Sequence, residues 1–313
     1  MTDALLKVRN LQIEFHTENE KLHAVDGIEF DIKPGETFAL VGESGSGKSV
    51  TALSVLRLLP RNAHLYAGEI TYKQQNLLVR TEAELCHIRG RRIAMIFQDP
   101  MASLNPVKTI GAQVAEVIKL HFDLSPHAVK EKSLKLLNQV EIPDPQRRYN
   151  EYPHQLSGGQ QQRIMIAIAL AGEPDLLIAD EPTTSLDVTI QAQILQLLKN
   201  IQQQTGMALW LISHDLALVS NLADRVSVMQ QGKIVETSVS KDLFSRPEHP
   251  YTRQLLESLP SMNSCIGHQS TDTPPLLKIE NFKVYYPIRK GVFKRIVDHV
   301  KAVDGVSFQL QQG

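Results

Sequence analysis

The stretch FALVGESGSGKS at residues 38–49 contains, at residues 42–49, the pattern G-x-x-x-x-G-K-[ST]. An apolar, strand-like run precedes the glycines, and a helical pattern at residues 50–59 follows them. Glycines let successive backbone N–H groups turn inward around an anion without Cβ clashes, and a helix N-terminus attracts negative charge. The arrangement therefore predicts a phosphate-binding loop between a strand and a helix.

The residues of this loop have distinct expected roles in binding ATP and Mg²⁺. We expect Lys48 to reach the β- and γ-phosphates and to act in catalysis, and Ser49 to ligate Mg²⁺. The residues expected to contact the nucleotide here are Gly42, Glu43, Ser44, Gly45, Ser46, Gly47, Lys48, Ser49 and Val50.

A second motif, LLIADEP at residues 176–182, ends an apolar run with two carboxylates. Ligands of open α/β sheets bind at the carboxyl edge of the strands, and this run places Asp180 at that edge. We expect Asp180 to hold Mg²⁺ and Glu181 to polarise the attacking water as general base. Together the two motifs predict an enzyme that hydrolyses ATP.

Most of the chain alternates apolar runs with helical patterns, which is typical of a buried parallel sheet. The runs lie at residues 38–41, 93–97, 176–179, 208–212 and 225–229. Residues 101–172 are mostly helical in pattern and predict an inserted helical subdomain. We expect an α/β fold of the P-loop NTPase type, with a mainly parallel sheet core, an antiparallel β subdomain and this helical insertion.

Composition narrows the class of protein further. The 313 residues carry a formal net charge of −1 and are 42% hydrophobic, which is typical of a globular protein and does not suggest a nucleic-acid partner. No apolar run is long enough to span a bilayer, and the N-terminus lacks the apolar core of a signal peptide. Cys86 and Cys265 suggest neither a disulfide framework nor a zinc site. We expect a cytoplasmic protein, or one peripheral to the cytoplasmic face of a membrane.

The motif LSGGQQQR at residues 156–163 predicts a second anion-binding helix N-terminus. Its residues Ser157, Gly158 and Gly159 precede a helix expected from about Gln160. One ATP needs only one phosphate loop, so a second such site suggests that the γ-phosphate is contacted from another domain. With all three motifs in order, the chain resembles the ABC ATPase family, in which two domains sandwich two ATP molecules.

The resemblance implies roles for further residues. In the family's pattern, Ser157, Gly158, Gly159 and Gln160 contact the nucleotide of the partner domain. Four other positions match the pattern one by one: Gln98 the glutamine that senses Mg²⁺ and acts in catalysis, Asp187 the loop that crosses the dimer, His214 the switch histidine that contacts γ-phosphate, and Phe15 the aromatic that stacks on adenine.

An internal repeat predicts the domain organisation. LLKVRNLQIEF at residues 5–15 matches LLKIENFKVYY at residues 276–286, and AVDGIEFDIKPG at residues 24–35 matches AVDGVSFQLQQG at residues 302–313. The stretch between them is rich in Ser, Thr, Pro and Asn, as linkers are. We expect an ABC nucleotide-binding domain at residues 1–260, a linker at 261–275, and the incomplete start of a second ABC domain at 276–313.

Three functions fit an ABC ATPase: the motor of an importer, a nucleic-acid-associated ATPase of the chromosome-maintenance or repair type, and a soluble translation factor with tandem domains. The chain has no heptad run, and its linker is short, polar and interrupted by prolines, which disfavours the last two. The importer therefore leads, and the other two remain as alternatives.

Three segments resemble the ATPases of oligopeptide, dipeptide and nickel importers: QDPMASLNP at residues 98–106, YPHQLSGGQQQR and HPYTRQLLESLP. YPIRKGVFKRIVDH at residues 286–299 is similar to the start of the second domain in the fused ATPases of Yej-type importers, which are associated with peptide and microcin C uptake. The resemblance implies a partner ABC domain in cis or in a homodimer, two permease subunits, indirectly a periplasmic solute-binding protein, and the cytoplasmic face of the bacterial inner membrane.

Overall fold

The computed structural model describes residues 3–16, 21–184, 186–258, 275–290 and 295–310. The chain divides into two compact units, residues 1–259 and 260–313. The expected linker, Cys265 and Ser185 lie outside the described residues, apart from the end of the linker at position 275.

The first unit is built on a sheet whose described strands follow the order β10-β9-β3-β8-β7-β6. Its members are β3 (Thr37–Val41), β6 (Ile93–Ile96), β7 (Leu176–Asp180), β8 (Ala208–Ser213), β9 (Arg225–Gln230) and β10 (Lys233–Val239). All neighbouring pairs are parallel except β9 with β10, which form a hairpin. The predicted mainly parallel sheet is confirmed.

The central strands are buried on both faces, which explains their continuous apolar sequence. In β3 all residues are buried, and alternate side chains enter different cores. Ala39 and Val41 pack in the core on the side of helices α7 (Gly158–Leu170) and α8 (Val188–Thr205). Phe38 and Leu40 pack in the core on the other face of the sheet.

That second core lies against an antiparallel sheet with the order β2-β1-β4-β5. Its strands are β1 (Leu6–His16), β2 (Lys21–Ile32), β4 (Ala63–Tyr72) and β5 (Gln75–Asn76). Helix α1 (Lys48–Val55) contributes Ala52 and Val55 to the same core. Helix α1 ends at Val55, short of position 59, where the predicted helical pattern ends. The predicted antiparallel subdomain is present.

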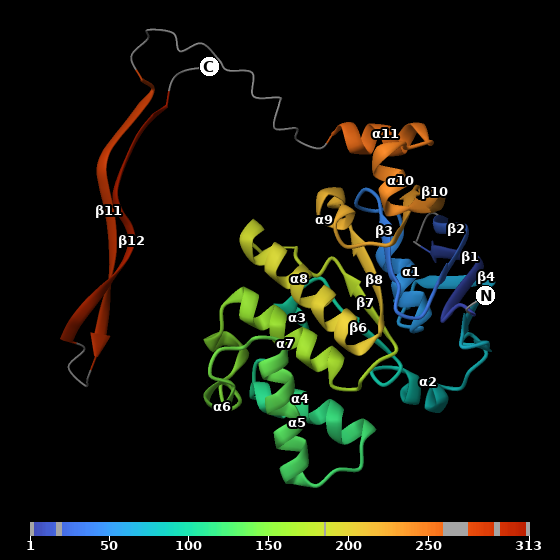
Figure 1. Ribbon diagram of the computed structural model, residues 1–313, viewed down its shortest axis with the longest axis horizontal. Coiled ribbons are helices and arrows are strands. Elements are labelled where there is room, and N and C mark those ends of the chain that lie inside the picture. Colours follow the sequence, from blue (N-terminus) through green and yellow to red (C-terminus); the bar gives the residue numbers. More distant parts are fainter. Residues whose placement is uncertain (1–2, 17–20, 185, 259–274, 291–294, 311–313) are drawn as a thin grey trace. The chain divides into compact units, whose positions relative to one another are not determined.

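The helices at residues 101–172 form a group apart from the antiparallel sheet (Figure 1). Ser125 and Thr109 cap α5 and α4 through side-chain oxygens that accept backbone N–H groups. The group comprises α3 (Pro100–Ser103), α4 (Ile110–His121), α5 (Pro126–Gln139), α6 (Pro145–Arg148), a 3₁₀ turn (Pro153–Gln155) and α7. Its apolar side chains join the core on the α7 side of the main sheet.

Four further helices complete the first unit: α2 (Glu82–Ile88), α9 (Leu216–Ser220), α10 (Ser240–Ser245) and α11 (Pro250–Glu257). Helix α2 begins with a capping box, in which the side chains of Thr81 and Glu84 each accept a hydrogen bond from the other's backbone N–H. Helix α11 lies within the HPYTRQLLESLP segment, and its N-cap is His249.

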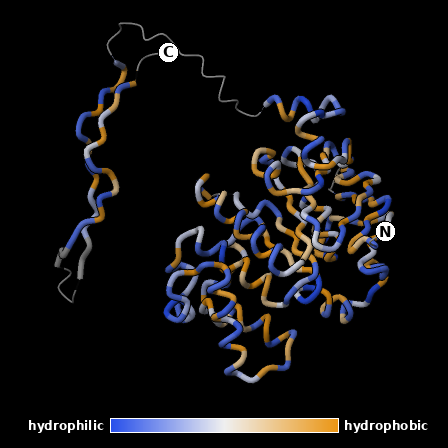
Figure 2. The backbone as a smooth tube through the Cα atoms, in the orientation of Figure 1, coloured by the Kyte–Doolittle hydropathy of each residue, from blue (hydrophilic) through white to orange (hydrophobic). Residues whose placement is uncertain are grey.

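The second unit is a hairpin of β11 (Leu277–Lys290) and β12 (Arg295–Leu310). Hydrophobic and hydrophilic residues alternate along both strands (Figure 2). The pairing repeats that of β1 with β2: Ile279 lies opposite Phe308 as Val8 lies opposite Phe30. The register shifts also fall at corresponding positions, after Ile279 as after Val8. The sequence repeat is therefore also a repeat of structure.

Candidate active site

Two of the predicted motifs, the glycine loop and the run that ends in Asp180 and Glu181, meet His214 at the carboxyl ends of three adjacent parallel strands. The glycine loop follows β3, Asp180 is the last residue of β7 and Glu181 follows it, and His214 follows β8. A cleft of about 970 Å³ opens there, lined by the loop together with Phe15, Gln98, Glu181, Thr184 and His214. The topology therefore brings together groups that are far apart in the sequence, at the edge where open α/β sheets bind ligands.

The loop needs glycine at two positions for a steric reason. Gly47 has φ +104°, and a Cβ there would lie 2.3 Å from the carbonyl oxygen of Ala24. Gly42 has φ +152°, and its Cβ would lie 2.1 Å from the carbonyl oxygen of Met229. Any side chain at these two positions would push the loop away from the strands that support it.

Lys48 lies at the centre of this loop and is only 4% exposed. Its ammonium donates hydrogen bonds to the carbonyl oxygens of Gly42 at 2.8 Å and Glu43 at 2.7 Å. Burial lowers the pKa of Lys48, although the negative charges of Glu181, Asp180 and Glu43 oppose that shift. The loop thus holds a cation where an anionic ligand would otherwise find only backbone N–H groups.

Ser49 and Asp180 form the candidate Mg²⁺ site. The Ser49 hydroxyl donates a 2.9 Å hydrogen bond to the Asp180 carboxylate, which is 6% exposed. Burial raises the pKa of Asp180, and the hydrogen bond from Ser49 opposes this. Hydroxyl and carboxylate oxygens suit Mg²⁺, which keeps several waters and binds phosphates as well. No group of three or more His, Cys, Asp or Glu residues that could hold a metal ion occurs within the described part of the chain.

Glu181 is held by three side chains around its carboxylate. Gln98 donates to Oε2 at 3.0 Å, Thr184 donates to Oε2 at 2.8 Å, and Nδ1 of His214 lies 3.1 Å from Oε1. Burial alone would raise the pKa of Glu181, but hydrogen bonds from His214 and Thr184, together with the charges of His214 and Lys48, outweigh it and lower the pKa. The carboxylate is therefore ionised and oriented at neutral pH, as a general base requires.

Thr184 is a site residue that the sequence motifs did not identify. It ends a tight turn after β7, in which its backbone N–H donates to the Glu181 carbonyl at 3.2 Å. The same turn places its hydroxyl against the Glu181 carboxylate. The signal in the sequence was Pro182, which favours a turn directly after Glu181 and so returns the third following residue to it.

The remaining predicted residues divide between the cleft and its surroundings. Phe15, on β1, lines the cleft beside the glycine loop. The residues of the LSGGQ motif do not line this cleft. Ser157 and Gln160 close a capping box, and α7 begins at Gly158, so the helix starts earlier than the predicted Gln160. Asp187 caps α8 by accepting the Ile190 N–H at 2.9 Å.

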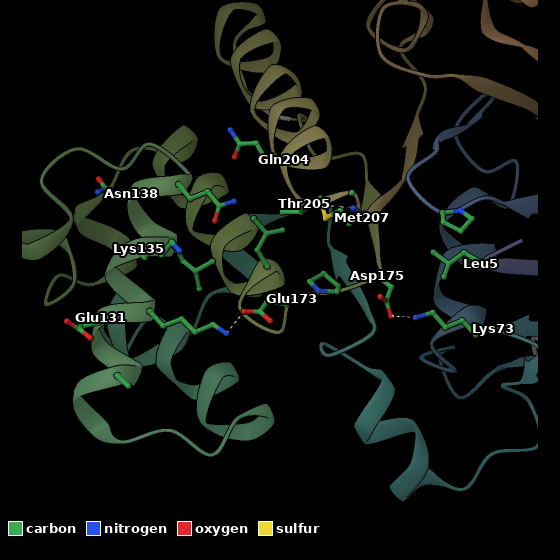
Figure 3. Close-up of a pocket in the computed structure, with 18 residues that line it drawn as sticks. Leu5, Lys73, Glu131, Lys135, Asn138, Glu173, Asp175, Gln204, Thr205 and Met207 are labelled. Carbon is green, nitrogen blue, oxygen red and sulfur yellow. Dashed lines mark hydrogen bonds and ion pairs between the residues drawn. The ribbon is translucent and has the colours of Figure 1, made fainter. Parts of the chain in front are cut away.

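A larger cavity, of about 1300 Å³, lies at the opposite ends of the strands (Figure 3). It is lined by Pro174 and Asp175, which precede β7, and by Met207, which precedes β8. Two of its lysines are paired with carboxylates, Lys132 with Glu173 at 2.6 Å and Lys73 with Asp175 at 2.9 Å. It contains none of the motif residues, so its greater volume does not make it the active site.

Comparison with known proteins agrees with the motifs. Residues 25–184 match the family described as "ABC transporter", and residues 235–287 match "Oligopeptide/dipeptide transporter, C-terminal region". The chain is 28% identical to the ATP-binding cassette MJ0796 in its dimeric post-hydrolysis state bound to ADP and Pi, with a TM-score of 0.68 over 75% of this chain and 98% of that one.

Three curated relatives are similar over most or all of this chain. It is 49% identical to the peptidoglycan transport ATP-binding protein YejF of Agrobacterium fabrum, over 100% of this chain and 57% of that one. It is 44% identical to the glutathione import ATP-binding protein GsiA of Salmonella typhimurium, over 99% of this chain and 54% of that one. It is 53% identical to the probable peptide ABC transporter ATP-binding protein y4tR of Sinorhizobium fredii, over 86% of this chain and 80% of that one.

The chain thus spans little more than half the length of the first two relatives. None of the helices in the described ranges is long and apolar enough to cross a membrane.

Proposed function

Because this chain belongs to the ABC transporter family, we propose that it is the ATP-hydrolysing subunit of an importer for peptides or related small solutes. The observation that carries the proposal is the convergence of the glycine loop, Asp180, Glu181 and His214 on one cleft. These groups come from the ends of three strands, β3, β7 and β8. Phosphoryl transfer needs them together, because positioning and electrostatics provide most of its catalysis.

Each residue of the cleft has its own role in binding or hydrolysing ATP. The backbone N–H groups of the loop and the Lys48 ammonium bind the β- and γ-phosphates. Thr184 and His214 orient the Glu181 carboxylate. Glu181 then takes the proton of the attacking water. Phe15 stacks on the adenine. Ser49, Asp180 and Gln98 would hold Mg²⁺, which neutralises charge on the phosphates.

The second half of the catalytic site comes from another ABC domain. The LSGGQ residues lie outside the cleft of their own unit. Leu186 and Ile190, on either side of Asp187 in the sequence, lie close to Gly158 and Gly159. Facing a second cleft, Ser157, Gly158, Gly159 and Gln160 would present a helix N-terminus to the γ-phosphate there. The β11–β12 hairpin, with the register of β1–β2, is the start of that second domain in cis, and a second copy of the chain is the other source.

The proposed membrane partners are two permease subunits. Residues 98–106 begin shortly after β6 and run from Gln98, which donates a hydrogen bond to Glu181, into the helical subdomain. Val107, immediately after them, is 80% exposed and offers an apolar contact. The protein would act at the cytoplasmic face of the inner membrane, with a periplasmic protein delivering the solute. Similarity to YejF, GsiA and y4tR supports a peptide-like solute, and YejF supports the Yej type.

The experiment is co-purification of the full-length protein with candidate permease subunits, followed by an ATPase assay of the complex in vesicles. We expect a stable complex whose hydrolysis rises when a peptide-loaded binding protein is added, and no rise for the Glu181→Gln complex. Failure to bind any permease, together with stable association with ribosomes or DNA, would contradict the importer.

A further inference from the structure

Tyr251 lies on α11, near the C-terminal end of the first unit, and its side chain contacts the phosphate loop. Its side chain is 7% exposed, and its hydroxyl oxygen accepts a 3.3 Å hydrogen bond from the backbone N–H of Glu43. Burial raises the pKa of Tyr251, and the hydrogen bond from the Glu43 backbone N–H opposes that shift. A residue outside all the nucleotide motifs therefore contacts the backbone of the loop.

The contacted residue also carries the loop's lysine. The Glu43 carbonyl accepts the hydrogen bond from the Lys48 ammonium at 2.7 Å, while the Glu43 N–H points to Tyr251. Glu43 thus links the tyrosine hydroxyl to the lysine through its two backbone groups. Without the hydroxyl, the Glu43 N–H loses its partner in a partly buried place, and the loop gains freedom to turn.

The start of α11 is itself anchored, so the position of Tyr251 is defined. The Glu236 carboxylate, on β10, accepts the backbone N–H groups of Glu248 and His249, each at 3.0 Å. His249 Nδ1 accepts the N–H of Tyr251 at 3.2 Å. One turn later Leu255 lines the same cleft as the loop. Helix α11 is therefore held against the sheet at its start and against the nucleotide cleft along its length.

We propose that Tyr251 is a positioning residue for nucleotide binding: its hydroxyl fixes the peptide of Glu43, and through it the Lys48 ammonium. This inference rests on the proposed binding of nucleotide to the loop. Because coupling between sites is reciprocal, nucleotide bound at the loop also stabilises the docking of α11. The C-terminal helix thereby responds to the occupancy of the cleft.

The first test compares Tyr251→Phe with Tyr149→Phe, which removes a hydroxyl from the helical subdomain far from the loop. The dissociation constants for Mg-ATP and Mg-ADP are measured by calorimetry, and kcat at saturating ATP by phosphate release. We expect Tyr251→Phe to raise both dissociation constants roughly three- to tenfold, the effect of one lost hydrogen bond, with kcat within about twofold. Tyr149→Phe should match the wild type.

Unchanged affinity in Tyr251→Phe, or a fall in kcat alone, overturns the positioning role. Wild-type protein that binds no ATP in the same titration contradicts the proposed function instead, so the two failures are distinct. A second readout is hydrogen exchange at the amides of α11 with and without Mg-ADP. We expect nucleotide to slow exchange there in the wild type and to have a smaller effect in Tyr251→Phe. Equal exchange with and without nucleotide in the wild type contradicts the coupling.

Discussion

The hydroxyl of Thr184 donates a 2.8 Å hydrogen bond to the carboxylate of Glu181, three residues earlier on the same turn. This contact fixes one carboxylate oxygen, while His214 lies against the other. It also stabilises the ionised form, because a hydroxyl donor favours negative charge on its acceptor. The turn after β7 is thus a positioning element for the proposed general base.

Replacing Thr184 with Val should move the pH dependence of hydrolysis. The hydrogen bond from Thr184 lowers the pKa of Glu181, so its loss raises that pKa. As the pH is lowered, Glu181 of the variant is therefore protonated at a higher pH than in the wild type, and activity is lost there. We expect the acid limb of the kcat–pH profile to shift upward and kcat at neutral pH to fall roughly threefold to tenfold. Thr184→Ser keeps the hydroxyl and should restore both. A profile for Thr184→Val that overlies the wild type contradicts this role.

Glu181→Gln should separate binding from hydrolysis. The amide keeps the size of the side chain but cannot accept the water's proton, so kcat should fall on the order of 10²–10⁴-fold while ATP affinity stays within about threefold. The measurement pairs single-turnover hydrolysis with equilibrium binding of ATP. Normal hydrolysis by this variant would show that another group is the base.

Ser157→Arg should leave ATP binding to an isolated domain intact and abolish hydrolysis. Ser157 is absent from the cleft of its own unit, so a bulky cation there does not obstruct the loop. It does block the helix N-terminus that we propose to contact the partner's γ-phosphate. Binding and turnover are measured on the same preparation, with Ser125→Arg, at the cap of α5, as the control for losing a helix cap. Full turnover in Ser157→Arg would remove the support for a two-domain sandwich.

Trp210→Ala should destabilise the first unit strongly. Trp210 is fully buried between the two sheets. Its ring packs against that of Phe30, with the two ring centroids 5.1 Å apart. Truncation of a buried aromatic typically lowers the free energy of unfolding by about 3–5 kcal/mol. Urea unfolding followed by circular dichroism measures the change, and Val79→Ala, at a site 77% exposed, should stay within about 0.5 kcal/mol. A loss below about 1 kcal/mol for Trp210→Ala contradicts this view of the core.

The parallel sheet and most of the cleft could be predicted because their signals are local. A buried parallel strand such as β3 is a continuous apolar run, and the loop after it has a fixed spacing of glycines. Since parallel strands carry their motifs to the same edge, Asp180 could be placed beside Ser49 from the sequence, and the two are hydrogen-bonded.

The side-chain contacts of Thr184 and Tyr251 were not predicted. Pro182 signals the turn after Glu181, but it does not show that the Thr184 hydroxyl meets the Glu181 carboxylate, and no pattern links Tyr251 to Glu43. Thr184 acts through a turn whose shape follows from Pro182 and the backbone of Glu181, which has φ +45°. Tyr251 meets Glu43 only because the start of α11 is fixed to Glu236 on β10, a strand far from the loop in the sequence. Helix ends were also misplaced by a few residues at α1 and α7, where capping decides the boundary.

The central claim, that the loop at residues 42–49 binds ATP through Lys48, has one direct test. Mg-ATP is titrated calorimetrically into the wild-type chain and into Lys48→Ala, with the fold of each checked by circular dichroism. We predict binding at one site per first unit in the wild type, and affinity weakened on the order of a hundredfold in Lys48→Ala, because the buried ammonium is the loop's only side-chain cation among the described residues. Equal affinity of a folded Lys48→Ala protein for Mg-ATP would contradict the account.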